Sequence, residues 1–446
     1  MSSRTGPVVT PDGAAYLRMA QGRPPIEGPA GHFPGGYPFV LSLISQLGLT
    51  SLSAARWLGA GLAGVSVVLA GSITNRMAGP RWSLVVSVAF AVATPIVHMH
   101  TAVLSEPLFI TLLLGWVLVM CPADRSRAAV AVGGAIAAAA CLTRFAGVAL
   151  LIATLLLLRR DRQQLWIFSI AAGVPLAVWG AAQVIWGAPT DRRVAWHPPS
   201  TALLGRGVSA VGGWVLGFPS PRPLGVAVAG LAAVLLWAAR RLPGGQVLGI
   251  AAACYGVVLL VTTAFLDAQT PLDGRLLGPL HVLVLLAVPA VGSLRIRERA
   301  VGRVVVAPAL GVALLVTARS TVDRVPSADP ELLAVASAQT ASATDALRGP
   351  FWSNSPSVIW LRSGAEARPL PKVEDPWTLE PNPDLQDELA SLRQELARGG
   401  YLVWFDGFAY RDYLPTQAEL VQALSVEPIA TLEDGVVYQH RDAKVP

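Results

Sequence analysis

Residues 8–40, VVTPDGAAYLRMAQGRPPIEGPAGHFPGGYPFV, form a polar loop at the head of a chain that is otherwise mostly apolar. The turn Thr10-Pro11-Asp12-Gly13 leads into a short expected helix over residues 13–20, so local backbone geometry holds the Asp12 carboxylate without help from a core. A carboxylate held in this way can face a cavity and do chemistry. Asp12 can equally cap the helix, which is a common use of Asp, and spacing alone leaves both interpretations open.

The composition predicts a polytopic membrane protein. Of the 446 residues, 53% are hydrophobic and 14% are charged, and the mean hydropathy of +0.53 is rare in a soluble protein of this length. The net charge of +6 does not indicate nucleic acid, because the arginines cluster between apolar stretches as membrane-flanking charges do. The cysteines, Cys121, Cys141 and Cys254, have no metal-ligand spacing and are expected to be core thiols.

About ten apolar stretches are expected to span the membrane, although several are short for a hydrocarbon layer of roughly 30 Å. Residues 38–49 are too few to cross, and we expect them to lie on the membrane and anchor the Asp12 loop. The two stretches around Arg144 predict a helical hairpin whose tip, residues 143–147, sits at membrane depth. The expected spans are residues 54–73, 84–97, 104–120, 128–142, 145–158, 165–186, 224–239, 248–265, 276–291 and 304–316.

Clusters of Arg in alternate connections predict the orientation, because positive loops stay in the cytoplasm. The remaining connections then face outward: the Asp12 loop, residues 98–107, the Arg144 tip, residues 187–223 and residues 267–275. Every polar residue with a candidate function lies on this outer side. The predicted cytoplasmic arginines are Arg76, Arg81, Arg125, Arg127, Arg159, Arg160, Arg162, Arg240, Arg241, Arg295, Arg297, Arg299 and Arg303.

The parity of the spans raises a question about the start of the chain. If residues 54–73 run from outside to inside, the first fifty or so residues must lie outside, yet no apolar span precedes them. We expect either a first span upstream of residue 1 or a translocated amino-terminal tail, and we favour the upstream span.

The last part of the chain changes character and predicts a small extracytoplasmic α/β domain, because helical and strand-like patterns alternate there. Expected helices cover residues 330–346, 383–398 and 415–424, and expected strands cover 358–361, 401–405, 426–430 and 436–439. The expected organisation is therefore an outer loop and interfacial helix (1–52), a transmembrane domain (53–319) and the α/β domain (320–446).

Five short motifs follow one another along the membrane part. They are Thr10-Pro11-Asp12-Gly13 with Tyr16, His32-Phe33-Pro34 with Gly36-Tyr37-Pro38, Leu104-Ser105-Glu106-Pro107-Leu108-Phe109, Leu142-Thr143-Arg144, and Asp273-Gly274-Arg275-Leu276-Leu277. Over residues 7–291, their order and common sidedness resemble the GT-C membrane glycosyltransferases, especially the bacterial protein-O-mannosyltransferase type of glycosyltransferase family 39. That family often has two adjacent acidic residues in the first loop. Here Gly13 follows Asp12, so a paired-carboxylate mechanism is not expected.

The resemblance implies an enzyme that transfers a sugar from a polyprenyl phosphate to an acceptor hydroxyl, with inversion. A phosphate leaving group needs no strong general acid, so one base suffices, and Asp12 is the candidate. Arg144 and Arg275 are expected to bind the donor phosphate, because a guanidinium contacts phosphate oxygens bidentately. For each arginine, snorkelling to the membrane interface is the alternative.

Glu106 is expected to assist catalysis by orienting the acceptor or, with Asp12, by holding a divalent cation, and helix capping is the alternative. His98 and His100 are further metal-ligand candidates, although their spacing is not diagnostic. The candidate substrate-binding residues are Tyr16, His32, Tyr37 and His100, which can also be ordinary interfacial residues.

Two other classes of protein fit a polytopic chain with outward polar loops. A transporter or flippase of a lipid-linked or small solute should show internal repeats, and none is visible. A non-catalytic membrane scaffold would tolerate the loss of Asp12, Glu106 and Arg144. The expected location is the cell membrane, with the site outside, and the expected partners are the lipid-linked donor and a glycan, lipid or protein acceptor.

Overall fold

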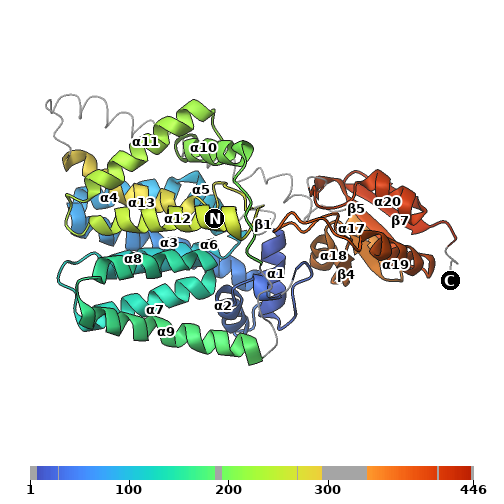
Figure 1. Cartoon of the computed structure of the whole chain (residues 1–446), viewed down its shortest axis with the longest axis horizontal. Helices are drawn as coiled ribbons and strands as arrows, with labels where there is room; N and C mark the ends of the chain where they lie inside the picture. The colour runs from blue at the N-terminus through green and yellow to red at the C-terminus, as the bar shows by residue number, and fades with distance from the viewer. Residues whose placement is uncertain are drawn as a thin grey trace.

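The computed structural model describes residues 8–28, 30–185, 193–268, 270–293, 339–408 and 411–442. A helical body holds the described residues up to Ser293, and a smaller unit with a β-sheet, described from Gln339, follows beside it (Figure 1). Nine of the ten expected spans coincide with helices, while residues 304–316 and the arginines at 295–303 lie outside the described residues. The helices are α3 (Ser51–Ala78), α4 (Pro80–Val92), α5 (Thr94–Thr101), α6 (Glu106–Met120), α7 (Arg127–Thr143), α8 (Val148–Leu158), α9 (Arg162–Ile185), α11 (Arg222–Ala239), α12 (Gln246–Phe265) and α13 (Gly278–Ala287).

The apolar helices make the chain a multi-pass membrane protein. Within the described residues, four helices are long and apolar enough to cross a membrane, namely α3, α9, α11 and α12. The bent pair α4 and α5 would make a fifth, and several helices of 10–17 residues are apolar but shorter. The number of spans therefore stays a prediction. Small residues pack the helices closely: a Cβ on Gly134 of α7 would lie 3.0 Å from the carbonyl oxygen of Phe168 on α9.

The structure adds detail to two expectations about the helical body. Residues 84–97 belong to a bent pair of helices, because the chain turns by 56° between α4 and α5, and whether this pair is one span stays a prediction. Pro95 lies in the first turn of α5 and has no N–H to donate to the preceding turn, so α4 does not continue through it, and Ala93 between the two helices is extended. The expected loop over residues 187–223 contains helix α10 (Thr201–Leu216), which Ser200 caps at its start. Its many glycines hid it, because Gly lowers helix propensity.

The first loop packs onto the helical body through a short parallel pairing. Strand β1 (Val8–Val9) pairs with β2 (Ala102–Val103), so Val9 lies opposite Val103. Helix α1 (Pro11–Ala20) follows β1, and helix α2 (Gly36–Ser45) takes the place of the expected interfacial helix. Gly36 approaches the end of α7 so closely that a Cβ there would lie 2.6 Å from the carbonyl oxygen of Leu142. The loop is therefore a packed part of the molecule.

The carboxy-terminal unit is an α/β layer, as the sequence predicts. Its sheet has the order β4-β3-β5-β7-β6, in which β4, β3 and β5 are parallel and β5, β7 and β6 are antiparallel. The strands are β3 (Phe351–Ser353), β4 (Ala367–Pro369), β5 (Tyr401–Phe405), β6 (Val426–Leu432) and β7 (Gly435–His440). The helices are α17 (Gln339–Ala343), α18 (Pro356–Ser363), α19 (Leu385–Ala397) and α20 (Gln417–Leu424).

One strand of this unit was mispredicted and two were missed. Residues 358–361, expected to be a strand, belong to helix α18, where Pro356 occupies the first turn and Gly364 ends the helix with φ +73°. Strands β3 and β4 are only three residues long, which is too short for a periodic signal. The expected helix over residues 330–346 is described only from Gln339 onward, as α17 and one further short turn.

Candidate active site

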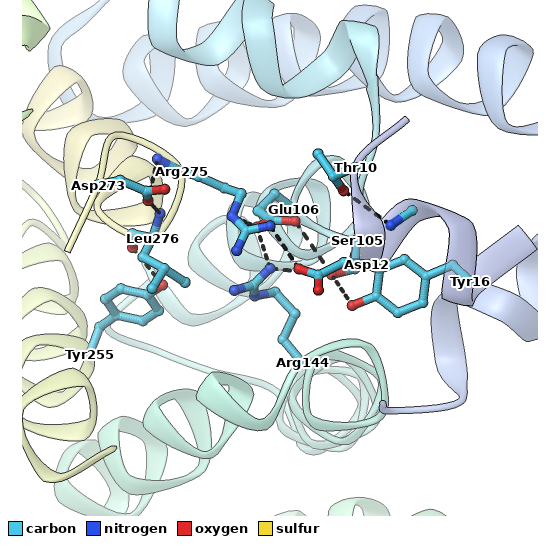
Figure 2. A network of polar contacts seen from close by, with 11 residues as sticks. Thr10, Asp12, Tyr16, Ser105, Glu106, Arg144, Tyr255, Asp273, Arg275 and Leu276 are labelled. Carbon is cyan, nitrogen blue, oxygen red and sulfur yellow. Dashed lines mark hydrogen bonds and ion pairs between the residues drawn. The ribbon is translucent and has the colours of Figure 1, made fainter. Parts of the chain in front are cut away.

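The pairing of β1 with β2 brings the two candidate carboxylates together. Asp12 lies three residues after Val9, and Glu106 lies three residues after Val103, its partner in the sheet. Thr10 caps α1, because its hydroxyl accepts from the backbone N–H of Gly13 at 3.0 Å. The capping interpretation of Asp12 is therefore wrong, and its side chain points into the site (Figure 2).

Glu106 is the buried centre of the site. Its Oε1 atom lies 2.6 Å from Nη1 of Arg144 and 3.2 Å from Nε of Arg275, so one carboxylate oxygen joins both guanidinium groups. Glu106 opens helix α6, but these contacts go beyond a helix cap. A carboxylate with 2% of its side chain exposed needs such compensation, because an unpaired buried charge is very unfavourable.

Arg275 also reaches the first loop, where its Nη1 atom donates to Oδ2 of Asp12 at 2.8 Å. Side-chain exposure rises from 2% at Glu106 and 15% at Arg144 to 25% at Arg275 and 41% at Asp12. Burial by itself disfavours the charged guanidinium, but the carboxylates of Glu106 and Asp12 outweigh this cost and raise the pKa of Arg275. The two arginines and two carboxylates form one charge-balanced cluster, which is open on the side of Asp12.

Neighbouring hydroxyl groups fix the cluster. The buried Ser105 hydroxyl lies 3.2 Å from Nη1 of Arg144 and 3.2 Å from the phenol oxygen of Tyr16. Burial and the nearby charge of Asp12 raise the pKa of Tyr16 to about 12, so the phenol stays protonated. Tyr16 thus lies at the site as predicted. Ser105 was missed as a site residue, although it stands in the quoted motif beside Glu106.

A turn holds Arg275 in place. Oδ1 of Asp273 accepts from the backbone N–H groups of Arg275 and Leu276, at 3.0 and 2.9 Å. The hydroxyl of Tyr255, on α12, donates to the carbonyl of Leu276 at 2.9 Å. Asp273 could have been found from its place in the Asp273-Gly274-Arg275 motif, whereas Tyr255 lies in the middle of an apolar helix and gives no signal in the sequence.

The other predicted substrate residues are less central. Tyr37 is buried and packs edge-on against Tyr16, with ring centroids 5.3 Å apart, so it belongs to the core of the loop. His100 is buried in α5 and its Nδ1 donates to the carbonyl of Ile96 at 2.8 Å. His32 lines the same cavity as Asp12, and its ring lies edge-on to Trp377 with centroids 4.1 Å apart.

The four candidate metal ligands do not all come together. Within the described ranges, no group of three His, Cys, Asp or Glu side chains lies close enough to share a metal ion. His98 is exposed and His100 is buried in its own helix, while Asp12 and Glu106 are paired with arginines. A divalent cation would have to compete with two guanidinium groups that already balance these carboxylates, so the residues do not fit a metal site.

A cavity of about 1060 Å³ extends from the cluster in two directions. Toward the membrane helices its lining is apolar and comes from α8 and α12, with Val148, Ile152, Val257, Val258 and Val261. Away from them, it is lined by residues of the carboxy-terminal unit, among them Asn354, Ser357, Lys372, Trp377, Arg411 and Tyr413. The charged cluster thus lies between an apolar wall and a mixed polar and aromatic wall.

Among the described residues, three ion pairs attach the carboxy-terminal unit to the first loop, and the longest joins Arg23 to Glu366 at 3.6 Å. Arg411 donates to Oε2 of Glu27 at 2.8 Å and to the carbonyl of Asn354 at 2.7 Å. Arg18 donates to both carboxylate oxygens of Glu366, at 2.8 and 3.0 Å. Specific contacts therefore hold the carboxy-terminal unit and the first loop together beside the cavity.

This architecture is the GT-C fold of membrane glycosyltransferases, which confirms the fold that the sequence predicts. Among solved structures, the chain is similar to ArnT from Cupriavidus metallidurans bound to undecaprenyl phosphate, with a TM-score of 0.59 at 13% identity over 100% of this chain and 96% of ArnT. ArnT in the apo state gives the same TM-score over 99% of this chain and 95% of ArnT, also at 13% identity. A weaker similarity, with a TM-score of 0.46 at 17% identity, links 92% of this chain to 35% of the arabinofuranosyltransferase AftD from Mycobacteria. No protein-family model matches the sequence, and no curated protein matches it. Because these identities are low, the similarity to ArnT establishes the fold alone.

Proposed function

We propose that the protein is an inverting membrane glycosyltransferase that moves a sugar from a polyprenyl phosphate to an acceptor hydroxyl on the outer face of the membrane. The observation that carries this proposal is the meeting of Arg144, Arg275 and Asp12 at the polar end of a cavity whose other wall is apolar. A polyprenyl phosphate has the same division, with an anionic head on an apolar chain. The assignment to glycosyltransferase family 39 belongs to this proposal.

The cluster supplies the groups that such a transfer needs. Asp12 accepts the proton of the acceptor hydroxyl while the acceptor oxygen bonds to the anomeric carbon. The bond from that carbon to the phosphate oxygen breaks, and the phosphate leaves with the electron pair. Arg144 and Arg275 stabilise the departing phosphate through charge-assisted hydrogen bonds. A single displacement of this kind inverts the configuration at the anomeric carbon.

The Arg275–Asp12 pair gives donor binding a second effect. In the present structure, Nη1 of Arg275 donates to Oδ2 of Asp12. A donor phosphate that binds Nη1 would replace Asp12 as its hydrogen-bond partner. Asp12 then becomes free to accept a proton, so the base is released when the leaving group is in place. Glu106 keeps its contacts to both arginines and acts as a positioning residue.

The apolar wall supports a lipid-linked donor. Side chains of α8 and α12 that line the cavity, such as Ile152 and Val257, are exposed on the helical body, where a prenyl chain can reach them from the bilayer. ArnT, which shares the fold, has been solved with undecaprenyl phosphate bound. The sugar, the prenyl chain length and the acceptor are left open by these features.

The decisive experiment uses the purified full-length protein in liposomes with a panel of polyprenyl-phosphate sugars. We expect carrier lipid to be released and sugar to appear on an acceptor in an envelope extract. Asp12→Asn should bind the donor and transfer no sugar. Movement of the intact sugar-lipid across the bilayer without cleavage would favour a transporter, and the absence of both activities would favour a scaffold.

The proposed orientation places Arg125 and Arg160 in the cytoplasm and the domain from residue 320 onward outside. In intact cells, a cysteine at Ser126 should resist a membrane-impermeant thiol reagent, and a cysteine at Pro199 should react. Reaction at Ser126 would reverse the topology and with it the outer location of the site. The proposed domain boundaries, after residue 52 and after residue 319, belong to the same proposal.

A further inference from the structure

The wall of the cavity opposite the arginines carries an aromatic platform. Trp377 stands at the tip of a tight hairpin, residues 373–382, in which the Asp375 N–H donates to the Glu380 carbonyl and the Asn382 N–H donates to the Val373 carbonyl. Oδ1 of Asp375 also accepts from the backbone N–H groups of Trp377 and Thr378, at 2.8 and 3.0 Å. The tip is therefore rigid. We call residues 373–382 the Trp377 hairpin.

The Trp377 hairpin contacts the first loop, which carries Asp12, and the loop that leads to Arg275. The carbonyl of Trp377 accepts from the N–H of Ala268, in the loop that leads to Arg275, at 3.1 Å. The Trp377 ring lies edge-on to His32 of the first loop. Trp377 therefore contacts both loops that supply Asp12 and Arg275, one through its backbone carbonyl and the other through its ring, and it lines their common cavity.

Lys372 and Tyr413 complete the platform. The ammonium group of Lys372 lies 4.8 Å from the centroid of Trp377 and 5.9 Å from that of Tyr413, and all three residues line the cavity. Ring faces that attract a cation also attract the weakly positive C–H groups of a sugar ring. A lysine on a flexible four-carbon stem can donate hydrogen bonds to the hydroxyl groups at the edge of the same sugar.

Other parts of the cavity argue against a peptide or a second lipid. A peptide would be expected to add to the edge strand β4, which borders the cavity, but Pro369 lies in that strand and removes a backbone donor. A lipid acceptor would need an apolar groove, and the apolar lining named above lies on the α8 and α12 side, where the donor chain belongs. The volume of about 1060 Å³ lies at the upper end of the range for ligand pockets, which is consistent with room for a donor headgroup and an acceptor sugar together.

We propose that Trp377, Lys372 and Tyr413 form the acceptor subsite, and that the acceptor is a glycan whose sugar ring stacks on this platform with one hydroxyl directed toward Asp12. This inference rests on the proposed function, because it names the acceptor class of the same reaction. It assigns the carboxy-terminal unit the task of selecting the acceptor.

The test measures binding separately from transfer. Saturation-transfer NMR on the purified full-length protein would use four probes, namely the linear trisaccharides of mannose, glucose, galactose and arabinose, and a Ser/Thr-rich peptide as a fifth. We expect at least one trisaccharide to bind, and Trp377→Ala to weaken that binding by about tenfold, while Trp377→Phe retains most of it. The matched control is Trp196→Ala, because Trp196 is exposed, packs on Phe265 and does not line the cavity, so binding should not change.

Several results would overturn the inference: no trisaccharide binds, only the peptide binds, or Trp377→Ala binds as the wild type does. Asp12→Asn should still bind the trisaccharide, and loss of binding there would place the sugar at the charged cluster and not on the platform. Transfer activity is scored on the same proteins. Asp12→Asn that transfers sugar normally would refute the proposed base, while a binding defect in Trp377→Ala would still support the acceptor subsite.

Discussion

Two ion pairs of this molecule have the same length and opposite surroundings. Arg275–Asp12 and Arg411–Glu27 each measure 2.8 Å. Arg411 also donates to the carbonyl of Asn354, and its side chain is only 7% exposed, so this pair is enclosed between the first loop and the carboxy-terminal unit. Both pairs line the cavity, but Arg275 and Asp12 are 25% and 41% exposed, whereas Glu27 is 26% exposed. A pair whose cation is almost fully buried holds parts of the molecule together, whereas a more exposed pair can exchange one partner for another ligand.

The sharpest way to break this comparison is to neutralise each carboxylate in turn. Asp12→Asn keeps the shape and removes the base, so we expect transfer to fall by at least about a hundredfold with the melting temperature unchanged. Glu27→Gln should lower the melting temperature and leave transfer within a few fold. Transfer assays and thermal unfolding in detergent check both variants. Full activity in Asp12→Asn would remove the central residue of the proposed mechanism.

The arginines of the cluster should show the next largest effect. Arg144→Gln and Arg275→Gln each remove a charge-assisted contact to the donor phosphate, which should cost about 1.5–3 kcal/mol, or about ten- to a hundredfold in donor affinity or rate. Lysine should rescue only partly, because it lacks the planar fork. Arg193→Gln is the matched control, since Arg193 is 79% exposed and its ion pair with Glu380 is long, at 3.7 Å. If both cluster variants kept normal donor binding and transfer, the arginines would be merely structural.

A smaller change is expected when the enclosed pair loses its cation. Arg411→Gln leaves Glu27 partly buried beside fewer donors, so the stability of the attachment should fall by about 1–3 kcal/mol. Limited proteolysis between the helical body and the carboxy-terminal unit measures this loosening. Arg368→Gln, which removes an exposed pair with Glu395, should change stability by less than about 1 kcal/mol. Equal protease resistance of Arg411→Gln and the wild type would show that the pair does not hold the unit in place.

The smallest effect should come from the cap of helix α20, far from both pairs. The carboxylate of Glu419 accepts hydrogen bonds from the hydroxyl and from the backbone N–H of Thr416. These bonds lower the pKa of Glu419. This contribution to stability is present above the usual pKa of a glutamate and is lost as the pH falls through the lowered value. Thr416→Ala should destabilise the unit by about 1 kcal/mol at neutral pH, and Glu419→Gln should reduce the loss of stability on acidification. Unchanged acid unfolding curves for both variants would contradict this.

The sequence predicts the helices and the candidate site residues better than it predicts the contacts between residues that are far apart in the chain. Apolar length located nine stretches that are helical in the structure, and motif order located Asp12, Glu106, Arg144 and Arg275, which the structure brings into one cluster. The partners within that cluster were not predictable, because Arg275 and Asp12 lie 263 positions apart and no periodicity connects them. The sequence also could not show that Glu106 would face two arginines.

The errors have local physical causes. Val358 and Ile359 are β-branched and buried, which favours a strand, but Pro356 and Gly364 delimit a helix around them. The histidines His98 and His100 were considered together because they are close in sequence. Residues two positions apart on a helix point in different directions, so His98 is exposed and His100 is buried.

The two-residue pairing of β1 with β2 also determines when the protein can become active during its synthesis. Val9 leaves the ribosome long before Val103, and a ladder this short cannot hold the loops together until the helices between them have packed. Arg275 emerges later still, and without it Asp12 has no arginine to hold it or to be exchanged for a phosphate. Under the proposed function, a partly inserted chain would therefore carry the Asp12 carboxylate without a complete site, and the cluster would assemble only after Arg275 has been added.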